Sequence, residues 1–200
     1  MKNRRILYIF IVLVITMLNA CNRITSDSEN VYLIEDYDVS FTFPGDWEDT
    51  KGEVFDLQCT DEDAYASIFV YNKIDLSEGQ TTEDLFHIQN EDLLGKRENV
   101  KLVSEENTYE TGNKQIHEVM YSAELDGIKN NYYFNLIEFD EEAEVFAWVL
   151  FTSVPLETKI NMDTWKKIIS SAEYRKSQQT ANMNVVHKVL PISREYFALR

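Results

Sequence analysis

Cysteine, proline and glycine are scarce in this 200-residue sequence, which contains two, three and six of them. None of the six glycines stands in a phosphate-cradling motif, so the sequence gives no sign of nucleotide binding. Cys59 is the only cysteine besides Cys21. If Cys21 is modified, no disulfide can form within the chain, and a hydrophobic core alone must hold the fold. Because Cys59 ends the alternating stretch FDLQC, we expect it to be a buried small hydrophobic residue and not a nucleophile.

Basic residues are also few, with 19 Lys and Arg against 35 Asp and Glu. Three of the basic residues precede Cys21, so the chain from Cys21 onward has sixteen basic and 35 acidic residues and a net charge of about −19. Nucleic acid is a poor partner for such a chain, because phosphate binding depends on clustered Lys and Arg. The same charge repels anionic lipid headgroups. A general contribution to solubility explains the net negative charge equally well.

One long apolar run is present, from Ile6 to Leu18, and Lys2, Arg4 and Arg5 precede it. This order is typical of a secretory signal. As a helix, these thirteen residues reach about 20 Å, whereas the hydrocarbon core of a bilayer is about 30 Å thick. The run therefore favours a cleaved leader over a permanent membrane span.

The residues that follow, Leu18-Asn19-Ala20-Cys21, resemble the lipobox of bacterial lipoproteins. This resemblance implies a signal peptide over 1–20, cleavage between Ala20 and Cys21, and a lipidated Cys21 with acyl chains such as palmitate. Two or three acyl chains anchor a protein stably at a membrane. Asn19 departs from the small or hydroxyl residue usual at its position, which leaves the efficiency of processing open. The alternatives are an uncleaved short anchor and a released secreted protein.

Three further segments differ in composition. Residues 21–30 are polar and aperiodic, and we interpret them as a tether. Residues 31–174 are predicted to form one domain. Residues 175–200 contain five basic residues and one acidic residue, whereas residues 21–174 contain eleven and 34. This basic extension is predicted to be a flexible appendage. The alternative is that its stretch VVHKVLPI adds to a sheet edge or folds back on the acidic domain.

Hydrophobic periodicity predicts an α+β fold. Strands are expected at 38–43, 55–59, 64–74, 100–110, 114–125, 129–139 and 144–154, with turns such as PGD, TDEDA, TGN and DG between neighbours. The last strand is apolar on both alternations, which predicts a central strand covered on both faces. A capping box of Thr81 and Asp84 opens a helix that ends at Gly95. Trp165, Ile168 and Ile169 predict a second, amphipathic helix after Pro155. The expected architecture is an antiparallel sheet of about six to seven strands flanked by two helices.

This order of elements, together with Phe41, Phe43, Pro44 and Trp47 of FTFPGDW and a Trp-bearing final helix, resembles the Mog1/PsbP-like family, and especially its small bacterial lipoproteins. The resemblance covers residues 31–174. It implies an α/β/α sandwich that serves as a docking or assembly module without catalytic activity. It assigns no functional residue in this chain.

Catalytic and metal-binding motifs are not evident. His87, His117 and His187 lie far apart without HExxH-type spacing, and no GxSxG motif is present, so no enzyme is expected and no cofactor is assigned. For His87 and His117 we expect structural or surface roles. The only candidate cation ligands are carboxylates on two predicted turns, namely Asp61 and Asp63 on one turn and Asp140 and Glu142 on the other. Two turns exposed to solvent would explain these acidic residues equally well.

We therefore expect a lipid-anchored module on the extracytoplasmic face of a bacterial cell membrane that engages an envelope protein partner. The surface that binds this partner is not identified by the sequence, although exposed tyrosines such as Tyr132 or Tyr133 are candidates. The alternative is a lipoprotein receptor for a cation or a small ligand. A hydrolase would need a nucleophile and a base to converge in a pocket.

Overall fold

The computed structural model describes residues 28–52, 54–140 and 142–175. Its strands are β1 (Glu29–Ile34), β2 (Val39–Pro44), β3 (Glu48–Asp49), β4 (Leu57–Thr60), β5 (Ala64–Asn72), β6 (Glu98–Thr111), β7 (Lys114–Leu125), β8 (Ile128–Glu138), β9 (Val145–Ser153) and β10 (Glu173–Tyr174). Its helices are α2 (Thr82–Leu94), α3 (Pro155–Ser171) and the short 3-10 turns η1 (Glu35–Tyr37) and η2 (Lys73–Asp75). No helix in these ranges is long and apolar enough to cross a bilayer.

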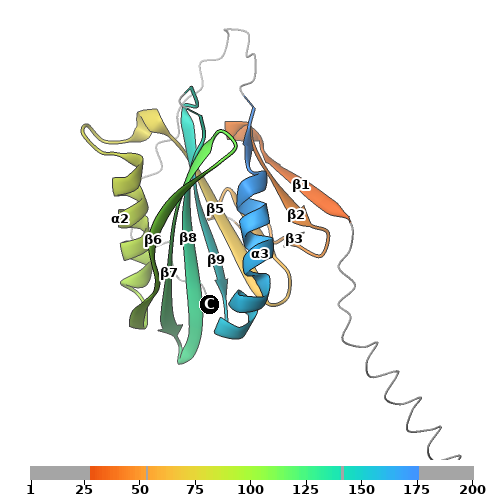
Figure 1. The fold of residues 1–200 in the computed structure, drawn as a ribbon, viewed down its shortest axis with the longest axis vertical. Coiled ribbons are helices and arrows are strands. Elements are labelled where there is room, and N and C mark those ends of the chain that lie inside the picture. The colour runs from red at the N-terminus through yellow and green to blue at the C-terminus, as the bar shows by residue number, and fades with distance from the viewer. Residues whose placement is uncertain (1–27, 53, 141, 176–200) are drawn as a thin grey trace, which may run out of the picture.

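A seven-stranded antiparallel sheet forms the centre of the domain, in the order β3-β4-β5-β9-β8-β7-β6 (Figure 1). Consecutive strands from β6 to β9 pair as the predicted meander, and β4 pairs with β5 as the predicted hairpin. Asp126 and Gly127 both have positive φ at the β7–β8 turn, which is the geometry of a type I′ hairpin. The α+β fold predicted from the sequence is confirmed.

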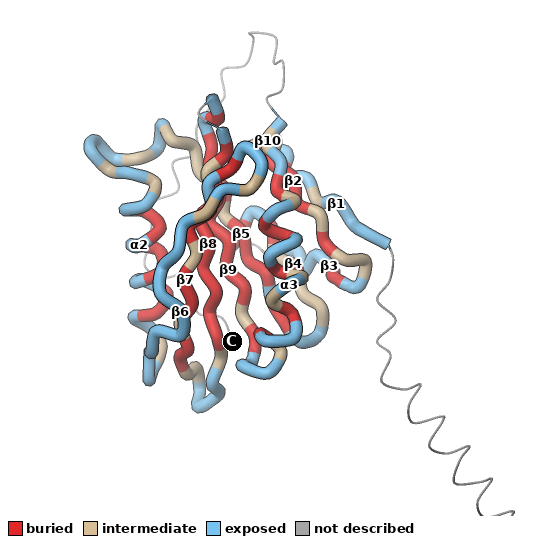
Figure 2. Tube along the Cα trace, in the orientation of Figure 1, coloured by how far each residue is buried: buried red, intermediate tan, exposed pale blue. Residues whose placement is uncertain are grey.

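Both faces of this sheet are covered, and each has its own hydrophobic core. Ala147, Val149 and Phe151 of β9 pack on one face with Trp165 and its neighbours in α3. The alternate residues of β9, Phe146, Trp148 and Leu150, pack on the other face with α2. Figure 2 shows β9 buried along nearly its whole length and β8 buried from Asn131 to Ile137. The prediction of a central strand covered on both faces is therefore confirmed.

Helix α2 begins where its cap predicts. The Thr81 side chain accepts from the Asp84 backbone N–H, and the Asp84 carboxylate accepts from the Thr81 N–H at 2.8 Å, which completes a capping box. Leu85, Phe86 and Leu93 are buried against the sheet. Ile88 of the same helix is exposed.

Helix α3 starts at Pro155, and Trp165, Ile168, Ile169 and Ala172 are buried as predicted. Lys114 of β7 closes its C-terminal end. Its ammonium group donates to the carbonyls of Ser170 and Ala172 at 2.5 and 2.6 Å. These carbonyls carry the partial negative charge of the helix end, so a buried lysine is well placed there.

A second, three-stranded sheet with the order β1-β2-β10 was not predicted. Strand β1 begins at Glu29, two residues before the expected domain start at Val31, so Glu29 and Asn30 belong to the sheet and not to the tether. Strand β2 is the strand predicted at 38–43, and its residues Val39, Phe41 and Phe43 are fully buried, while Ser40 between them is also buried. This small sheet packs beside α3, where the Thr42 N–H donates to the Ser171 hydroxyl at 2.9 Å.

Candidate functional site

A groove of about 350 Å³ runs between α2 and the edge strand β6. Its lining comprises His87, Asn90, Glu91 and Leu94 from α2, Gly95 directly after α2, Val100 and Glu106 from β6, and Val119 and Tyr121 from β7. The pairing of β6 with β7 is irregular at three places between Glu98 and Asn107, which is the part of β6 that lines the groove. Bulges bend an edge strand and re-aim its side chains, so these irregularities shape the groove wall.

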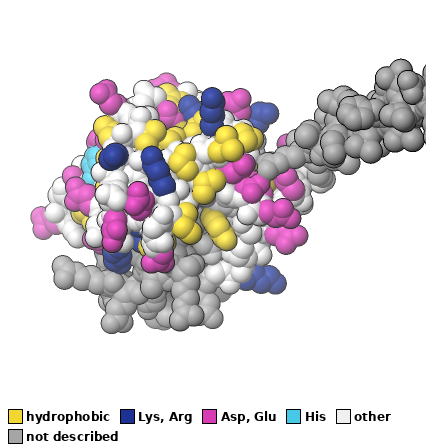
Figure 3. Space-filling model, turned by 90° about the horizontal axis from the view of Figure 1, so that it is seen from below, with side chains coloured by type: hydrophobic (Ala, Val, Ile, Leu, Met, Phe, Trp, Pro, Cys, Tyr) yellow, Lys and Arg dark blue, Asp and Glu magenta, His cyan; other side chains and the backbone are white. Residues whose placement is uncertain are grey.

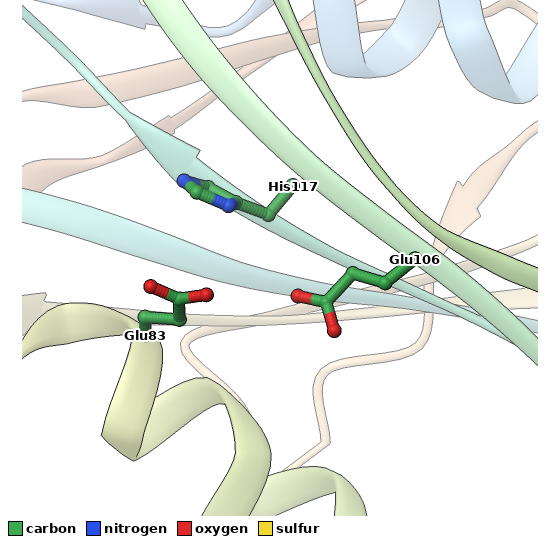
Figure 4. Close-up of side chains that lie close together, drawn as sticks. All are labelled: Glu83, Glu106 and His117. Carbon is green, nitrogen blue, oxygen red and sulfur yellow. The ribbon is translucent and has the colours of Figure 1, made fainter.

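Carboxylate and imidazole groups gather at one end of this groove. Glu83 of α2, Glu106 of β6 and His117 of β7 each present a ligand atom, and the three atoms lie within 4.8 Å of one another (Figure 4). His87 adjoins them, with its Nε2 atom 3.8 Å from Glu106 Oε1 and 4.0 Å from Glu83 Oε1. Three separate elements thus bring nitrogen and oxygen donors to one point.

His117 is the buried member of this group and is held by neighbours on both sides. Its Nε2 lies 3.3 Å from Glu138 Oε2 on β8, and Glu138 also accepts from the Thr82 hydroxyl at 2.6 Å. Because a carboxylate only accepts, Nε2 of the neutral ring carries the proton. The Nδ1 lone pair then accepts from the Thr108 hydroxyl at 3.0 Å. The contacts on both sides hold the ring in one orientation.

Thr108, His117 and Glu138 have the order of a hydrolase triad, namely hydroxyl, imidazole and carboxylate. A triad also needs a concave pocket beside the hydroxyl to hold a substrate. Thr108 does not line the groove between α2 and β6, and it does not line the cavity beside Lys114 and Ala172. The arrangement orients His117 and does not by itself make a hydrolytic site.

An apolar surface lies at a different end of the domain, where β7 turns into β8 and where α3 begins. Figure 3 views the molecule from this end and shows apolar side chains gathered there. The exposed large apolar residues of these two segments are Ile128 (59 %), Val154 (40 %), Leu156 (67 %) and Ile160 (56 %). We call these four residues the end surface. Large apolar side chains exposed near one another on a highly charged protein make a candidate interaction surface.

A polar group is also buried beneath α3. Tyr133 of β8 donates its hydroxyl proton to Glu118 of β7, and Lys166 of α3 lies 3.6 Å from the same carboxylate. Burial, followed by this hydrogen bond, raises the pKa of Tyr133. The phenol therefore stays protonated and joins the sheet to α3.

The turn carboxylates considered as cation ligands do not converge. Asp61 and Asp63 lie on the β4–β5 turn beside Ser153, whereas Asp140 and Glu142 precede Val145 at the other end of β9. The nine residues of β9 separate the two turns by about 27 Å. Asp61 instead accepts from the N–H groups of Asp63 and Ala64 at 3.1 and 2.8 Å, so it shapes its own turn.

Tyr132 or Tyr133 was a candidate for an exposed tyrosine at the partner surface, and this prediction is wrong because neither is exposed. Each is only 2 % exposed, because β8 is covered by α2 on one face and by α3 on the other. Cys59 is fully buried as predicted, and burial raises its pKa to about 12, so its thiol is a poor nucleophile. Ala20, Cys21 and His187 lie outside the described residues.

Sequence spacing gave no indication of the group at the groove. His87 and His117 were recognised singly, but Glu83 and Glu106 were not singled out at all. The four residues lie on three elements, and only the i, i+4 pair Glu83 and His87 carries a local signal.

Comparison with solved structures identifies the fold. Cyanobacterial PsbP (CyanoP) from Synechocystis sp. PCC 6803 is similar with a TM-score of 0.53 and 13 % identity, over 78 % of this chain and 97 % of that chain. LpqN of Mycobacterium tuberculosis is similar with a TM-score of 0.54 and 11 % identity, over 72 % and 89 %. The chain has the Mog1/PsbP-like fold.

The Ran-binding protein Mog1p of Saccharomyces cerevisiae is also similar, with a TM-score of 0.49 and 10 % identity over 73 % of this chain and 95 % of that one. No protein-family model matches the sequence, and no curated protein matches it either. At such low identity a shared fold carries no functional residue from one protein to another.

Proposed function

We propose that this protein is a non-catalytic binding module that is tethered by a lipidated Cys21 to the extracytoplasmic face of a bacterial cell membrane and engages an envelope protein partner. The end surface is the observation that carries this proposal. Four large apolar side chains are exposed together on two adjoining segments, although the chain from Cys21 onward has a net charge of about −19. Burial of such a patch against a partner is favourable because it removes apolar area from water.

The charge of the domain supports a protein partner over direct contact of the end surface with lipid. Residues 21–174 contain 34 acidic and eleven basic residues, and the resulting negative charge repels anionic lipid headgroups. A partner with an apolar centre and a basic rim would complement both the patch and its surroundings. LpqN, which has the same fold, is involved in cell envelope biogenesis, and this setting agrees with the proposed location.

The partner is best sought by crosslinking in the cells that make the protein. A photo-crosslinking residue at Leu156 or Ile160 should capture one specific protein, and the same residue at Lys167 should not, because Lys167 is exposed further along α3. With the photo-crosslinking residue placed at Ile128 instead, the double variant Leu156→Gln, Ile160→Gln should no longer capture the partner. The control variant Lys167→Gln should still capture it. Equal capture from all positions would refute a specific docking surface.

The anchor is tested separately. Mass spectrometry of the protein extracted from membranes should find an amino terminus at Cys21 with a diacylglyceryl thioether. The Cys21→Ala variant should keep its leader or leave the membrane fraction. Recovery of an unmodified Cys21 on a chain that still begins with Met1 would contradict the proposed lipidation.

The second candidate, a receptor for a cation or small ligand, is favoured by the carboxylates and imidazoles at the groove and not by the turn carboxylates from which it was first inferred. This possibility has a specific chemical form, which is developed next.

A further inference from the structure

We infer that Glu83, His87, Glu106 and His117 form a binding site for one divalent transition-metal cation of the Zn²⁺ type, at the end of the groove between α2 and β6. This inference does not depend on the proposed partner, because the site and the end surface share no residue. It also differs from the sequence-based expectation that His87 and His117 have only structural or surface roles.

The first argument is geometric. Zn²⁺ binds imidazole nitrogen and carboxylate oxygen at about 2.0–2.2 Å, so tetrahedral ligand atoms lie about 3.4 Å apart. The ligand atoms of Glu83, Glu106 and His117 lie within 4.8 Å of one another, and His87 lies within 4.0 Å of both carboxylates. The side chains of Glu83 and Glu106 are 57 % and 36 % exposed, so rotation about their side-chain bonds can shorten these distances.

The second argument is the kind of donor. Two imidazoles and two carboxylates suit Zn²⁺ and its neighbours among the transition metals, whereas Ca²⁺ and Mg²⁺ prefer oxygen ligands alone. An acidic surface would attract any of these cations, but only a transition metal gains from the two nitrogens. The site is therefore expected to select by ligand chemistry and not by charge.

The third argument is that the ring of His117 is already oriented. Metal-bound histidines commonly donate their second N–H to a carboxylate, which fixes the ring and raises its basicity. Glu138 accepts from His117 Nε2 in this way and is itself held by Thr82. The remaining nitrogen, Nδ1, has its lone pair available once the exposed Thr108 hydroxyl turns to solvent. A cation would thereby join α2 to β6 and β7, which are paired with each other as neighbouring strands.

The test is calorimetric titration of the full-length chain in detergent with Zn²⁺ at about 0.15 M salt, where screening removes weak surface binding. One equivalent should bind, and Mg²⁺ at the same concentration should not compete. Glu106→Gln and His87→Gln should each weaken Zn²⁺ binding at least tenfold. Glu110→Gln removes the same charge from the same exposed strand and should leave affinity unchanged, as should His187→Asn.

Co²⁺ provides a second readout, because its visible absorption reports nitrogen and oxygen ligands directly. The Co²⁺ spectrum of the unmodified chain should change on His87→Gln and stay unchanged on Glu110→Gln. Circular dichroism of each variant establishes that it is folded, which is expected because Glu106 and His87 are on the surface. Equal loss in Glu106→Gln and Glu110→Gln, or several equivalents that no single variant affects, would mean diffuse binding to the acidic surface and would overturn the inference. Partner crosslinking from the end surface should persist in Glu106→Gln, so the two proposals fail separately.

Discussion

The Cys59 thiol makes the stability of the fold sensitive to alkaline pH. Burial raises its pKa from 9.0 to about 12. In the unfolded chain the thiol ionises near pH 9, whereas in the folded chain it keeps its proton up to about pH 12. The contribution of the buried thiol to the free energy of unfolding is therefore fully present below pH 9 and is lost between pH 9 and 12. The loss is about 1 kcal/mol per pH unit. Urea unfolding at pH 8 and pH 10 should show a decrease in stability that is smaller by about 1 kcal/mol in Cys59→Ala. An equal decrease in both proteins would mean that the thiol is accessible to water.

The hydrogen bond between Trp148 and Asn90 joins α2 to the central strand. The indole N–H donates to Asn90 Oδ1 at 2.9 Å, and both side chains are buried. Trp148→Phe leaves that oxygen unsatisfied and should reduce the free energy of unfolding by about 1–3 kcal/mol. Denaturant unfolding of a double-mutant cycle with Asn90→Leu measures the coupling. If the two losses simply add, the bond contributes nothing beyond packing.

Single residues also show where reasoning from sequence stops. The pattern of β8 gives Tyr132 and Tyr133 opposite faces, and at least one of them would be exposed if one face of the sheet met water. Whether a second layer covers that face depends on where α2 and α3 pack, which the alternation within β8 does not encode. Both tyrosines are buried for this reason.

At the scale of elements, the cap of α2 controls how firmly the groove wall is held. Thr81→Ala removes the hydroxyl that accepts from the Asp84 N–H and keeps only the backbone bond to the Asp84 carboxylate, so it should cost about 1 kcal/mol, whereas Thr81→Ser keeps the hydroxyl and should cost little. Hydrogen exchange of the α2 amides should accelerate in the alanine variant alone. Acceleration throughout the sheet would indicate that α2 does not unfold locally.

Elements whose apolar residues recur with a clear helical or strand period were predictable from the sequence, and elements without such a period were not. The alternation of Val39, Phe41 and Phe43 and the helical spacing of Trp165, Ile168 and Ile169 report burial that each segment creates by itself. Strands β1 and β10 exist because β2 offers them hydrogen-bonding edges, and Val31 and Leu33 of β1 remain exposed. The groove residues Glu83, Glu106 and His117 come together only when α2 packs on the sheet, so their sequence positions give no warning of it.

At the scale of the whole molecule, net charge should determine how the protein responds to salt. With 35 acidic residues against sixteen basic ones after position 20, like charges repel more strongly in the compact state than in the expanded one. The midpoint of thermal unfolding should rise as NaCl increases from about 10 mM to about 300 mM, because the Debye length falls. The measurement is calorimetry in a buffer without divalent cations. A midpoint that falls with salt would show that attractive ion pairs dominate.

Strand β2 is bordered by the first and the last described strands, and Thr42 meets Ser171 at a separation of 129 positions. When the chain leaves a ribosome or a translocation pore from its amino end, β2 is therefore not enclosed until α3 and β10 have also emerged. Until then, the aromatic residues of FTFP stay accessible to chaperones and proteases, so a truncated product would be recognised as unfinished.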